Sequence, residues 1–224
     1  MKCLGRRSVL AALTAATLAG SLSACAPVLV GSAAVTAALV ATDRRTAGMQ
    51  VEDERIEQAM AAQVRGLGPD IGRVQATSFN RVLLLTGEVR SAQDKQRVAE
   101  QAALVENVRS VVNEVEVVPF ISSLTQRTTD TFITSKVKAS LLDAKDLQSR
   151  VIKVVTEMNV VYLMGIVTPR ESQRAAEIAR GVNDVRKVVR VFETISEAEL
   201  ARYETQPAPV SESTSTSPVY GGTQ

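Results

Sequence analysis

The 224-residue chain contains no His, no Trp and only two Cys. Without His there is no Ser-His-Asp or Cys-His catalytic system, no His-bound zinc and no imidazole pH switch. Two thiolates are too few for a four-Cys zinc site or an iron–sulfur cluster. We therefore expect a protein that is not an enzyme and that holds neither a metal nor another cofactor.

Aromatic residues make up only 3% of the chain and hydrophobic residues 45%, so a core must consist mainly of aliphatic side chains. The 26 Lys and Arg nearly balance the 24 Asp and Glu. A nucleic-acid-binding protein usually has a clear positive excess. We therefore expect no nucleic acid among the partners.

The first 24 residues have the features of a bacterial lipoprotein signal peptide. Three basic residues and no acid occur within 1–7, and an uncharged, largely apolar stretch follows over 8–20. Residues 22–25 are Leu-Ser-Ala-Cys, which resembles the lipobox, where the Cys is acylated and becomes the mature N-terminus. We predict that Cys25 carries acyl chains such as palmitate, which are sufficient for stable anchoring.

Other interpretations of the N-terminus stay open. Arg6 and Arg7 could belong to a twin-arginine export signal, and Cys25 could be an ordinary buried Cys. Residues 9–41 could form one transmembrane helix, although Pro27 interrupts the stretch. We interpret 25–48 as an acylated N-terminus and tether.

The remaining sequence contains two copies of one unit, offset by 77 or 78 residues. VLLLTGEV at 82–89 corresponds to VVYLMGIV at 160–167, and QRVAE at 96–100 corresponds to QRAAE at 173–177. A repeat of this length indicates a repeated structural unit.

Each copy predicts the order helix, strand, strand, helix, strand. The first helix of each copy has apolar residues four positions apart, which is a helical spacing. The expected strands are 74–77, 82–89 and 111–118 in the first copy, and 152–156, 160–167 and 188–195 in the second. Asn80 and Asn159 lie in the short loops between the first two strands, where Asn favours a tight hairpin.

This seventy-residue unit, with its V-x-L-x-G-x-V strand and a later V-x-x-V-(R/K)-x-V-V segment, resembles the BON domain. Two such units behind a lipobox are similar to outer-membrane lipoproteins with two BON domains. The resemblance implies an α+β fold of two tandem BON domains, each an αββαβ three-stranded mixed sheet packed on one face by two helices. The expected segments are BON domain 1 at 49–118, a linker at 119–127, BON domain 2 at 128–196 and a disordered tail at 197–224.

Gly87 and Gly165 occupy matched positions inside the expected second strands. Gly within a strand usually marks a bulge or a close approach of backbones, so we interpret both as structural. The Gly-rich segment 66–72 lacks the Lys-Ser/Thr of a phosphate-binding loop.

The two copies differ in charge. Residues 50–118 contain 8 basic and 11 acidic residues, whereas residues 128–196 contain 11 basic and 8 acidic ones, so the net charges are −3 and +3. Each cation near an anionic membrane contributes about 1 kcal/mol of binding free energy. The second copy is therefore the one expected to approach such a membrane.

The first helix of the second copy carries the candidate site, formed by Phe132, Ser135, Lys136 and Lys138. An aromatic residue flanked by lysines on the outer face of a helix is typical of an interfacial helix. The equivalent of Phe132 in the first copy is Arg55, which lies among acidic residues. The family resemblance also implies binding of anionic phospholipid by this helix, with Trp in the family pattern where this chain has Phe132.

The lipobox predicts a lipid-anchored protein, and the family resemblance implies that it lies on the periplasmic face of the outer membrane and supports envelope integrity. Ala26 follows the acylated Cys instead of the Asp that in similar lipoproteins favours the inner membrane. The expected partners are anionic phospholipids (phosphatidylglycerol, cardiolipin) and the outer membrane, with outer-membrane assembly or division-site proteins as further candidates. Two alternatives stay open. The second domain could be an adaptor for an outer-membrane assembly component, or the chain could be an envelope hydrolase that uses carboxylates.

Overall fold

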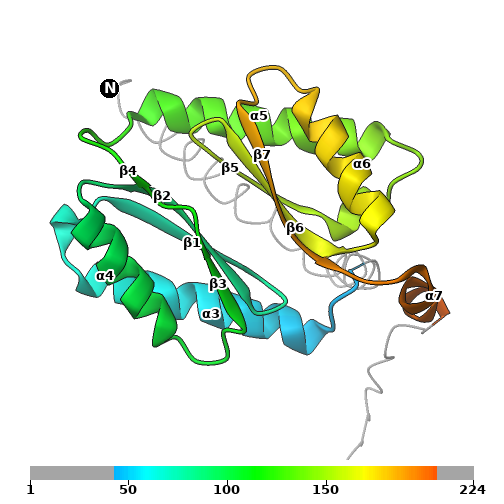
Figure 1. The fold of residues 1–224 in the computed structure, drawn as a ribbon, viewed down its shortest axis with the longest axis horizontal. Coiled ribbons are helices and arrows are strands. Elements are labelled where there is room, and N and C mark those ends of the chain that lie inside the picture. The colour runs from blue at the N-terminus through cyan, green and yellow to red at the C-terminus, as the bar shows by residue number, and fades with distance from the viewer. Residues whose placement is uncertain (1–42, 206–224) are drawn as a thin grey trace, which may run out of the picture. The chain divides into compact units, whose positions relative to one another are not determined.

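The computed structural model describes residues 43–205, which form two αββαβ domains and a C-terminal helix (Figure 1). The first domain contains α3 (Ala47–Gly66), η2 (Pro69–Ile71), β1 (Arg73–Phe79), β2 (Val82–Val89), α4 (Ala92–Ala103), β3 (Ser110–Asn113) and β4 (Glu116–Val117). The second contains α5 (Leu124–Asp143), η3 (Ser149–Val151), β5 (Lys153–Glu157), β6 (Val160–Val167), α6 (Pro169–Arg180) and β7 (Lys187–Thr194), and α7 (Glu197–Thr205) follows. The predicted order of elements is confirmed in both copies.

Each domain has a mixed sheet with its second strand in the centre. β1 and β2 are antiparallel, as are β5 and β6, while β7 runs parallel to β6. In the first domain the third strand is divided into β3 and β4, which both pair in parallel with β2. The division occurs at Val115, which is buried, and whose amide donates a hydrogen bond to the Asn113 side chain at 3.2 Å.

The two hairpins have the tight turns that their sequences predict. The central residues Asn80 and Arg81 have φ of 50° and 65°, and Met158 and Asn159 have φ of 52° and 62°. Positive φ at both positions is the geometry of a two-residue turn whose twist matches that of the strands.

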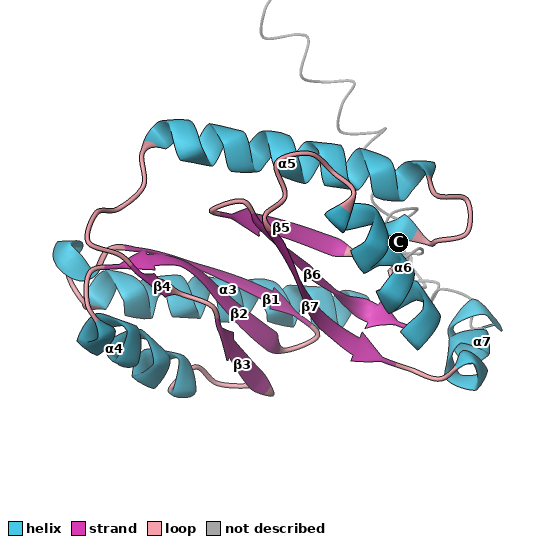
Figure 2. Cartoon of the chain, turned by 45° about the horizontal axis from the view of Figure 1, so that its top comes forward, coloured by secondary structure: helices cyan, strands magenta, loops and turns pink. Residues whose placement is uncertain are grey.

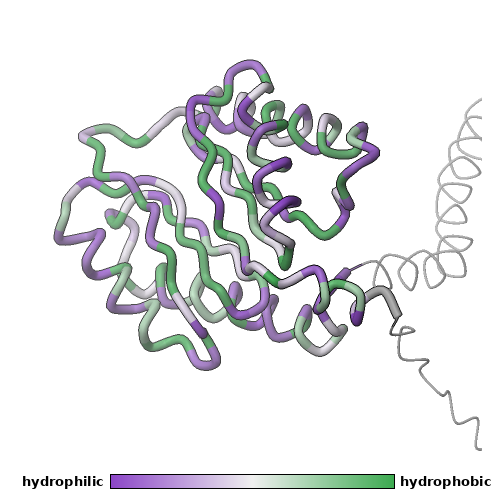
Figure 3. Tube along the Cα trace, turned by 45° about the vertical axis from the view of Figure 1, so that its right-hand side comes forward, coloured by the Kyte–Doolittle hydropathy of each residue, from purple (hydrophilic) through white to green (hydrophobic). Residues whose placement is uncertain are grey.

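The helices of each domain cover one face of its sheet. In the first domain Ile56 and Met60 of α3 pack with Leu83 and Leu85 of β2, and in the second Ile133 and Val137 of α5 belong to the equivalent core. Figure 3 shows hydrophobic and hydrophilic segments alternating along the helices, as expected for elements with one buried face.

The opposite faces of the two sheets pack against each other, as Figure 2 shows for the magenta strands. Phe79 and Leu84 of the first domain form a cluster with Val160, Tyr162 and Met164 of the second. β2 is buried at every position after Val82, and β6 at every position. The central strands are therefore covered on both faces.

Ion pairs lie around this apolar interface. They join cations of the positively charged second domain to acids of the negatively charged first domain. Lys153, Arg186 and Lys187 of the second domain pair with acidic residues of the first, namely Glu57 at 2.8 Å, Glu116 at 3.2 Å and Glu114 at 3.9 Å. Acids of the first domain therefore partly neutralise these three cations, and less of the net +3 of the second domain is left for a membrane than the sequence alone suggests.

The chain is more ordered at the domain boundaries than the sequence analysis predicts. The predicted tether 25–48 is too long at its C-terminal end. Arg44 is buried against the second domain, and α3 already begins at Ala47. The linker also ends earlier, since α5 already begins at Leu124.

The prediction of disorder from residue 197 is wrong for α7. Ser196 and Glu199 form a reciprocal cap, in which the Ser196 hydroxyl accepts from the Glu199 amide at 3.2 Å and the Glu199 carboxylate accepts from the Ser196 amide at 2.8 Å. Leu200 provides a buried contact for this helix. The S-x-x-E pattern is a helix-start signal that sequence analysis could have used. The predicted disorder of 206–224 lies outside the described residues.

Candidate functional site

The four candidate residues share the solvent-facing side of α5. Phe132 is 64% exposed, and Ser135, Lys136 and Lys138 are also exposed. Successive residues of a helix are rotated by about 100° around its axis. With this rotation Phe132 and Ser135 point in similar directions, and Lys136 and Lys138 lie on either side of them. The structure therefore brings the candidate residues together on one accessible surface. We call the exposed side of α5 between Leu124 and Leu142 the α5 outer face.

Asp130 fixes the orientation of α5 on its sheet. Its carboxylate is buried and accepts hydrogen bonds from the amides of Met158 and Asn159, at 3.1 and 2.9 Å, in the β5–β6 turn. Asp53 on α3 binds the amides of Asn80 and Arg81 in the same way, at 2.8 Å each. With the helix fixed, the apolar side of α5 enters the core and Phe132 points outward.

The hydrogen bonds of Asp53 also change its acidity. Burial raises the pKa of this carboxyl. Hydrogen bonds from the Arg81 amide, the Ser78 hydroxyl and the Arg45 guanidinium together lower it by more than burial raises it, so the pKa of Asp53 lies below its usual range. Asp53 is therefore held as a carboxylate. Asp53 and Asp130 are 77 residues apart, and an acid at the same place in both copies is a signal in the sequence from which this role could have been predicted.

The two lysines of the α5 outer face differ in their surroundings. Lys136 Nζ lies 3.1 Å from the Asp184 carboxylate, in a pair whose side chains are both more than half exposed. Lys138 has no ion-pair partner among residues 43–205. Of the two predicted cations, Lys138 is therefore unpaired among the described residues, and Lys136 is partly neutralised by the exposed Asp184 carboxylate.

Two further exposed residues extend the candidate site. Leu124 is 72% and Leu142 is 65% exposed, at the two ends of α5. They are 18 residues apart, which is five helical turns, so they lie on the same side of the helix about 27 Å from each other. Neither residue is among those predicted for the site, although their 18-residue spacing is visible in the sequence.

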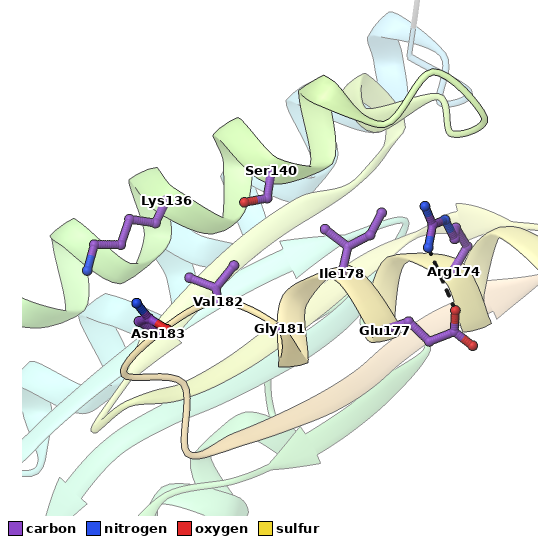
Figure 4. Close-up of a pocket in the computed structure, with 8 residues that line it drawn as sticks. All are labelled: Lys136, Ser140, Arg174, Glu177, Ile178, Gly181, Val182 and Asn183. Carbon is purple, nitrogen blue, oxygen red and sulfur yellow. Dashed lines mark ion pairs between the residues drawn. The ribbon is translucent and has the colours of Figure 1, made fainter.

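A groove runs between α5 and α6 beside this surface (Figure 4). It has a volume of about 430 Å³ and is lined by Lys136, Ser140, Arg174, Glu177, Ile178, Gly181, Val182 and Asn183. Lys136 and Ser140 come from α5, while the other residues come from α6 and the loop that follows it (Figure 4). We call this feature the α5–α6 groove.

The first domain offers no equivalent of the α5 outer face. Its α3 carries Arg55 where α5 has Phe132, and the Arg55 guanidinium binds Glu52 at 3.0 Å. The positions matching Leu124 and Leu142 are Ala47 and Arg65. The apolar line along α5 is therefore not a requirement of the fold.

The two glycines lie where the backbone passes close to a neighbouring segment. Gly87 has φ of 114°, and a Cβ there would lie 2.0 Å from the Arg73 carbonyl oxygen. At Gly165 a Cβ would lie 2.6 Å from the Val151 carbonyl oxygen. This geometry supports a structural role for both. The predicted lipidation site, Cys25, lies outside the described residues.

Other kinds of site find little support in the part of the chain that the structure describes. Residues 43–205 contain no cluster of three or more side chains suited to a metal ion. The same residues include no helix of the length and hydrophobicity needed to cross a bilayer.

Comparison with known proteins gives a consistent family match. The BON domain model matches residues 50–119 and 129–195. The chain is 37% identical to the outer membrane lipoprotein DolP of Haemophilus influenzae over 189 residues, which cover 82% of this chain and 94% of DolP. It is 31% identical to a 21 kDa hemolysin of Actinobacillus pleuropneumoniae, covering 67% of this chain and 78% of that protein. It is also 32% identical to the osmotically-inducible protein Y of Escherichia coli, covering 59% and 69%.

Proposed function

The chain belongs to the BON-domain family as a two-domain relative of the outer membrane lipoprotein DolP, and on this premise we propose that it is a non-enzymatic outer-membrane lipoprotein that supports envelope integrity. In this proposal Cys25 carries the acyl anchor, the folded domains face the periplasm, and the second domain binds anionic phospholipid through α5. The observation that carries the lipid-binding step is Phe132, 64% exposed between Lys136 and Lys138.

The hydroxyl groups of α5 support contact with a membrane. Thr128, Thr131 and Ser135 are exposed, and each hydroxyl donates to the carbonyl oxygen four residues earlier, at 3.2, 2.9 and 3.0 Å. A hydroxyl that already has a partner loses less free energy when it leaves water. The α5 outer face can therefore enter the membrane interface without leaving these donors unsatisfied.

The expected affinity suits a protein that is already anchored. Two lysines contribute about 1 kcal/mol each at an anionic surface, and burial of the exposed part of Phe132 adds about 1–2 kcal/mol. The sum corresponds to a Kd on the order of millimolar. Acyl chains on Cys25 would hold the domain at a comparable effective concentration, so the anchor and α5 act as two signals for one membrane.

Vesicle flotation tests this proposal on the mature chain with Cys25→Ser. We expect binding to phosphatidylglycerol or cardiolipin vesicles, no binding to phosphatidylcholine vesicles, and weaker binding in higher salt. Phe132→Glu and the double variant Lys136→Glu/Lys138→Glu should both lose binding. The matched controls are Leu104→Glu and Arg65→Glu/Lys95→Glu in the first domain, which make the same changes of polarity and charge away from α5.

Single-cysteine labelling tests whether α5 enters the membrane, and it is feasible because Cys25→Ser leaves the mature chain without Cys. A polarity-sensitive fluorophore at positions 124, 132 and 142 should brighten severalfold on anionic vesicles, and one at the exposed position 104 should not. Absence of binding to any vesicle would refute the proposal. Crosslinking of a periplasmic partner through Phe132 would then favour the adaptor function.

A further inference from the structure

A second groove lies between β3 of the first domain and β7 of the second, two strands that lie beside each other in Figure 1 and Figure 2. It has a volume of about 560 Å³. It is lined by Val82, Arg109, Ser110, Val112 and the β7 residues 189–194. We call it the β3–β7 groove. It shares no residue with the α5 outer face.

β7 is an open edge of its sheet. It pairs with β6 over all eight of its residues, and no other strand within residues 43–205 pairs with it. Alternate backbone N–H and C=O groups of an edge strand point away from its neighbour. β7 therefore presents free main-chain donors and acceptors beside the groove, and only another polypeptide backbone can satisfy the whole row.

The matching edge of the first domain is interrupted. Its Asn113 lies 77 residues before Arg190 of β7. The Asn113 side chain accepts a hydrogen bond from the Val115 amide at 3.2 Å, and the edge strand divides there into β3 and β4. An interruption of this kind protects an exposed edge from pairing. β7 contains neither an interruption nor a proline, so the second domain keeps a continuous edge where the first does not.

The floor of the groove is apolar and incompletely covered. Val82 and Val112 of the first domain and Val189 and Val191 of the second pack at the margin of the cluster between the sheets, where they are only partly buried. An extended segment beside β7 would alternate its side chains, so every second one would lie over these valines. Apolar residues at those positions would remove the remaining valine surface from water.

One cation beside this floor is unpaired. Arg190 is exposed and has no ion-pair partner in the described part of the chain. Glu193, the acid of the groove, already binds the Arg109 guanidinium at 3.2 Å and accepts a hydrogen bond from the Asn80 side chain at 2.7 Å. The groove therefore has one positive charge left to attract an acidic side chain.

We propose that the β3–β7 groove binds an extended segment of a partner protein, which adds to the edge of β7 as a further strand. Apolar side chains at alternate positions of the segment cover Val112, Val189 and Val191. Arg190 lies on the opposite face of β7, so an intervening side chain of the segment meets it, and that side chain is acidic. A second copy of this chain is a poorer occupant, since an antiparallel pair of β7 strands centred on Arg190 would place two guanidinium groups opposite each other.

A synthetic peptide tests this proposal on the mature chain with Cys25→Ser. The probe is fluorescently labelled Thr-Val-Thr-Val-Glu-Val-Thr-Val-Thr, which has valines on one face and a central Glu on the other. We expect saturable binding by fluorescence anisotropy and severalfold slower hydrogen exchange at β7 amides. Only one set of alternate peptide amides can face β7. N-methylation of that set should abolish binding, and N-methylation of the other set should not.

Charge reversal on both partners tests the contact with Arg190. Arg190→Glu should weaken binding of the Glu peptide about fivefold and should favour a peptide with Lys in place of the central Glu. Arg180→Glu is the matched control, because Arg180 is an exposed arginine of the same domain that does not line the groove. It should leave the affinities for both peptides unchanged.

Absence of binding, equal effects of the two N-methylated peptides, or an unchanged preference in Arg190→Glu would overturn the proposal. Binding by a chain that ends at Thr205, but not by the full mature chain, would assign the groove to residues 206–224 instead. A dimer in sedimentation that the Glu peptide dissociates would assign it to a second copy. None of these outcomes alters the proposed function, which rests on vesicle binding through α5.

Discussion

Arg44 and Glu171 form a two-point ion pair that is almost fully shielded from solvent. The two terminal nitrogens of Arg44 donate to the two carboxylate oxygens of Glu171, each at 2.8 Å, and both side chains are 4% exposed. Arg44 also donates to the Ile166 carbonyl oxygen at 2.7 Å. The next residue, Arg45, binds Asp53 of the first domain at 2.7 Å. Consecutive arginines thus join the two domains immediately before α3.

Breaking this pair should destabilise the protein strongly. Arg44→Met leaves Glu171 buried without its cation, which typically costs about 3–5 kcal/mol. Urea unfolding of Arg44→Met, Glu171→Gln and the double variant measures the coupling, and the double variant should lose about 1–3 kcal/mol less than the sum. Gln at 171 can still cap α6 through Thr168, so additive losses would show that the ion pair contributes little.

Acid should weaken the same contact. Burial raises the pKa of Glu171. The Arg44 guanidinium and the Thr168 amide together lower it by more than burial raises it, so the folded-state pKa lies below the usual 4.5. The stabilisation is therefore present above pH 4.5 and is lost as pH falls through the folded-state pKa. The stability difference between the unmodified chain and Glu171→Gln should be constant from pH 7 to 5 and shrink below pH 4.5. A constant difference down to pH 3 would contradict this assignment.

Much of the fold follows from the repeated pattern, but the contact between the domains does not. The apolar run of β6, from Val160 to Val167, shows in hindsight that both faces of this strand are covered, since a one-sided sheet would alternate. The identity of the covering surface depends on contacts such as Phe79 with Tyr162. No local propensity encodes a pairing between residues so distant in the sequence.

Part of the candidate site could also be predicted from the sequence, and part could not. Helical spacing is sufficient to place Phe132 and Lys138 on the outside of α5, because the core positions Ile133 and Val137 define its inner side. The pairing of Lys136 with Asp184 could not be predicted, since it depends on how the loop after α6 folds back toward α5.

A buried charge cluster at the domain interface gives another prediction. Arg73 pairs with both Glu88 and Glu157, so one cation faces two carboxylates. Arg73→Met leaves both acids unpaired and should lower stability by about 3–5 kcal/mol at pH 7, whereas Glu157→Gln leaves one matched pair and should cost less.

The pH dependence of this cluster has the opposite sign to that of Glu171. Burial raises the pKa of Glu157 above its usual value despite the Arg73 guanidinium. The folded state then binds the proton more tightly than the unfolded state, so the contribution of Glu157 to stability improves as pH falls through its folded-state pKa. Removal of Arg73 also removes the interaction that lowers this pKa, so Glu157 takes up its proton at higher pH in Arg73→Met than in the unmodified chain. The loss of stability in Arg73→Met should therefore be smaller at pH 5 than at pH 7, as measured by urea unfolding at both values. A larger loss at pH 5 would contradict the cluster model.

Gly87→Ala tests the close approach of β2 to β1. The added Cβ would lie 2.0 Å from the Arg73 carbonyl oxygen, on a backbone with φ of 114°. We expect a loss of at least about 2 kcal/mol in thermal or urea unfolding. Gly66→Ala is the control, since its Cβ meets nothing within 4 Å and should leave stability unchanged or slightly higher. Equal stability of the two variants would show that the sheet adjusts to the Cβ.

Asp184→Asn should strengthen the binding of anionic lipid. The substitution removes the carboxylate 3.1 Å from Lys136 Nζ, and Asn readily adopts the φ of 73° found at this position. One additional unneutralised charge should tighten binding to phosphatidylglycerol vesicles about fivefold, with a steeper dependence on salt. Asp70→Asn makes the same change of charge in the first domain and should have little effect. A similar gain in both variants would mean that net charge alone controls binding, and no gain in either would place Lys136 outside the lipid contact.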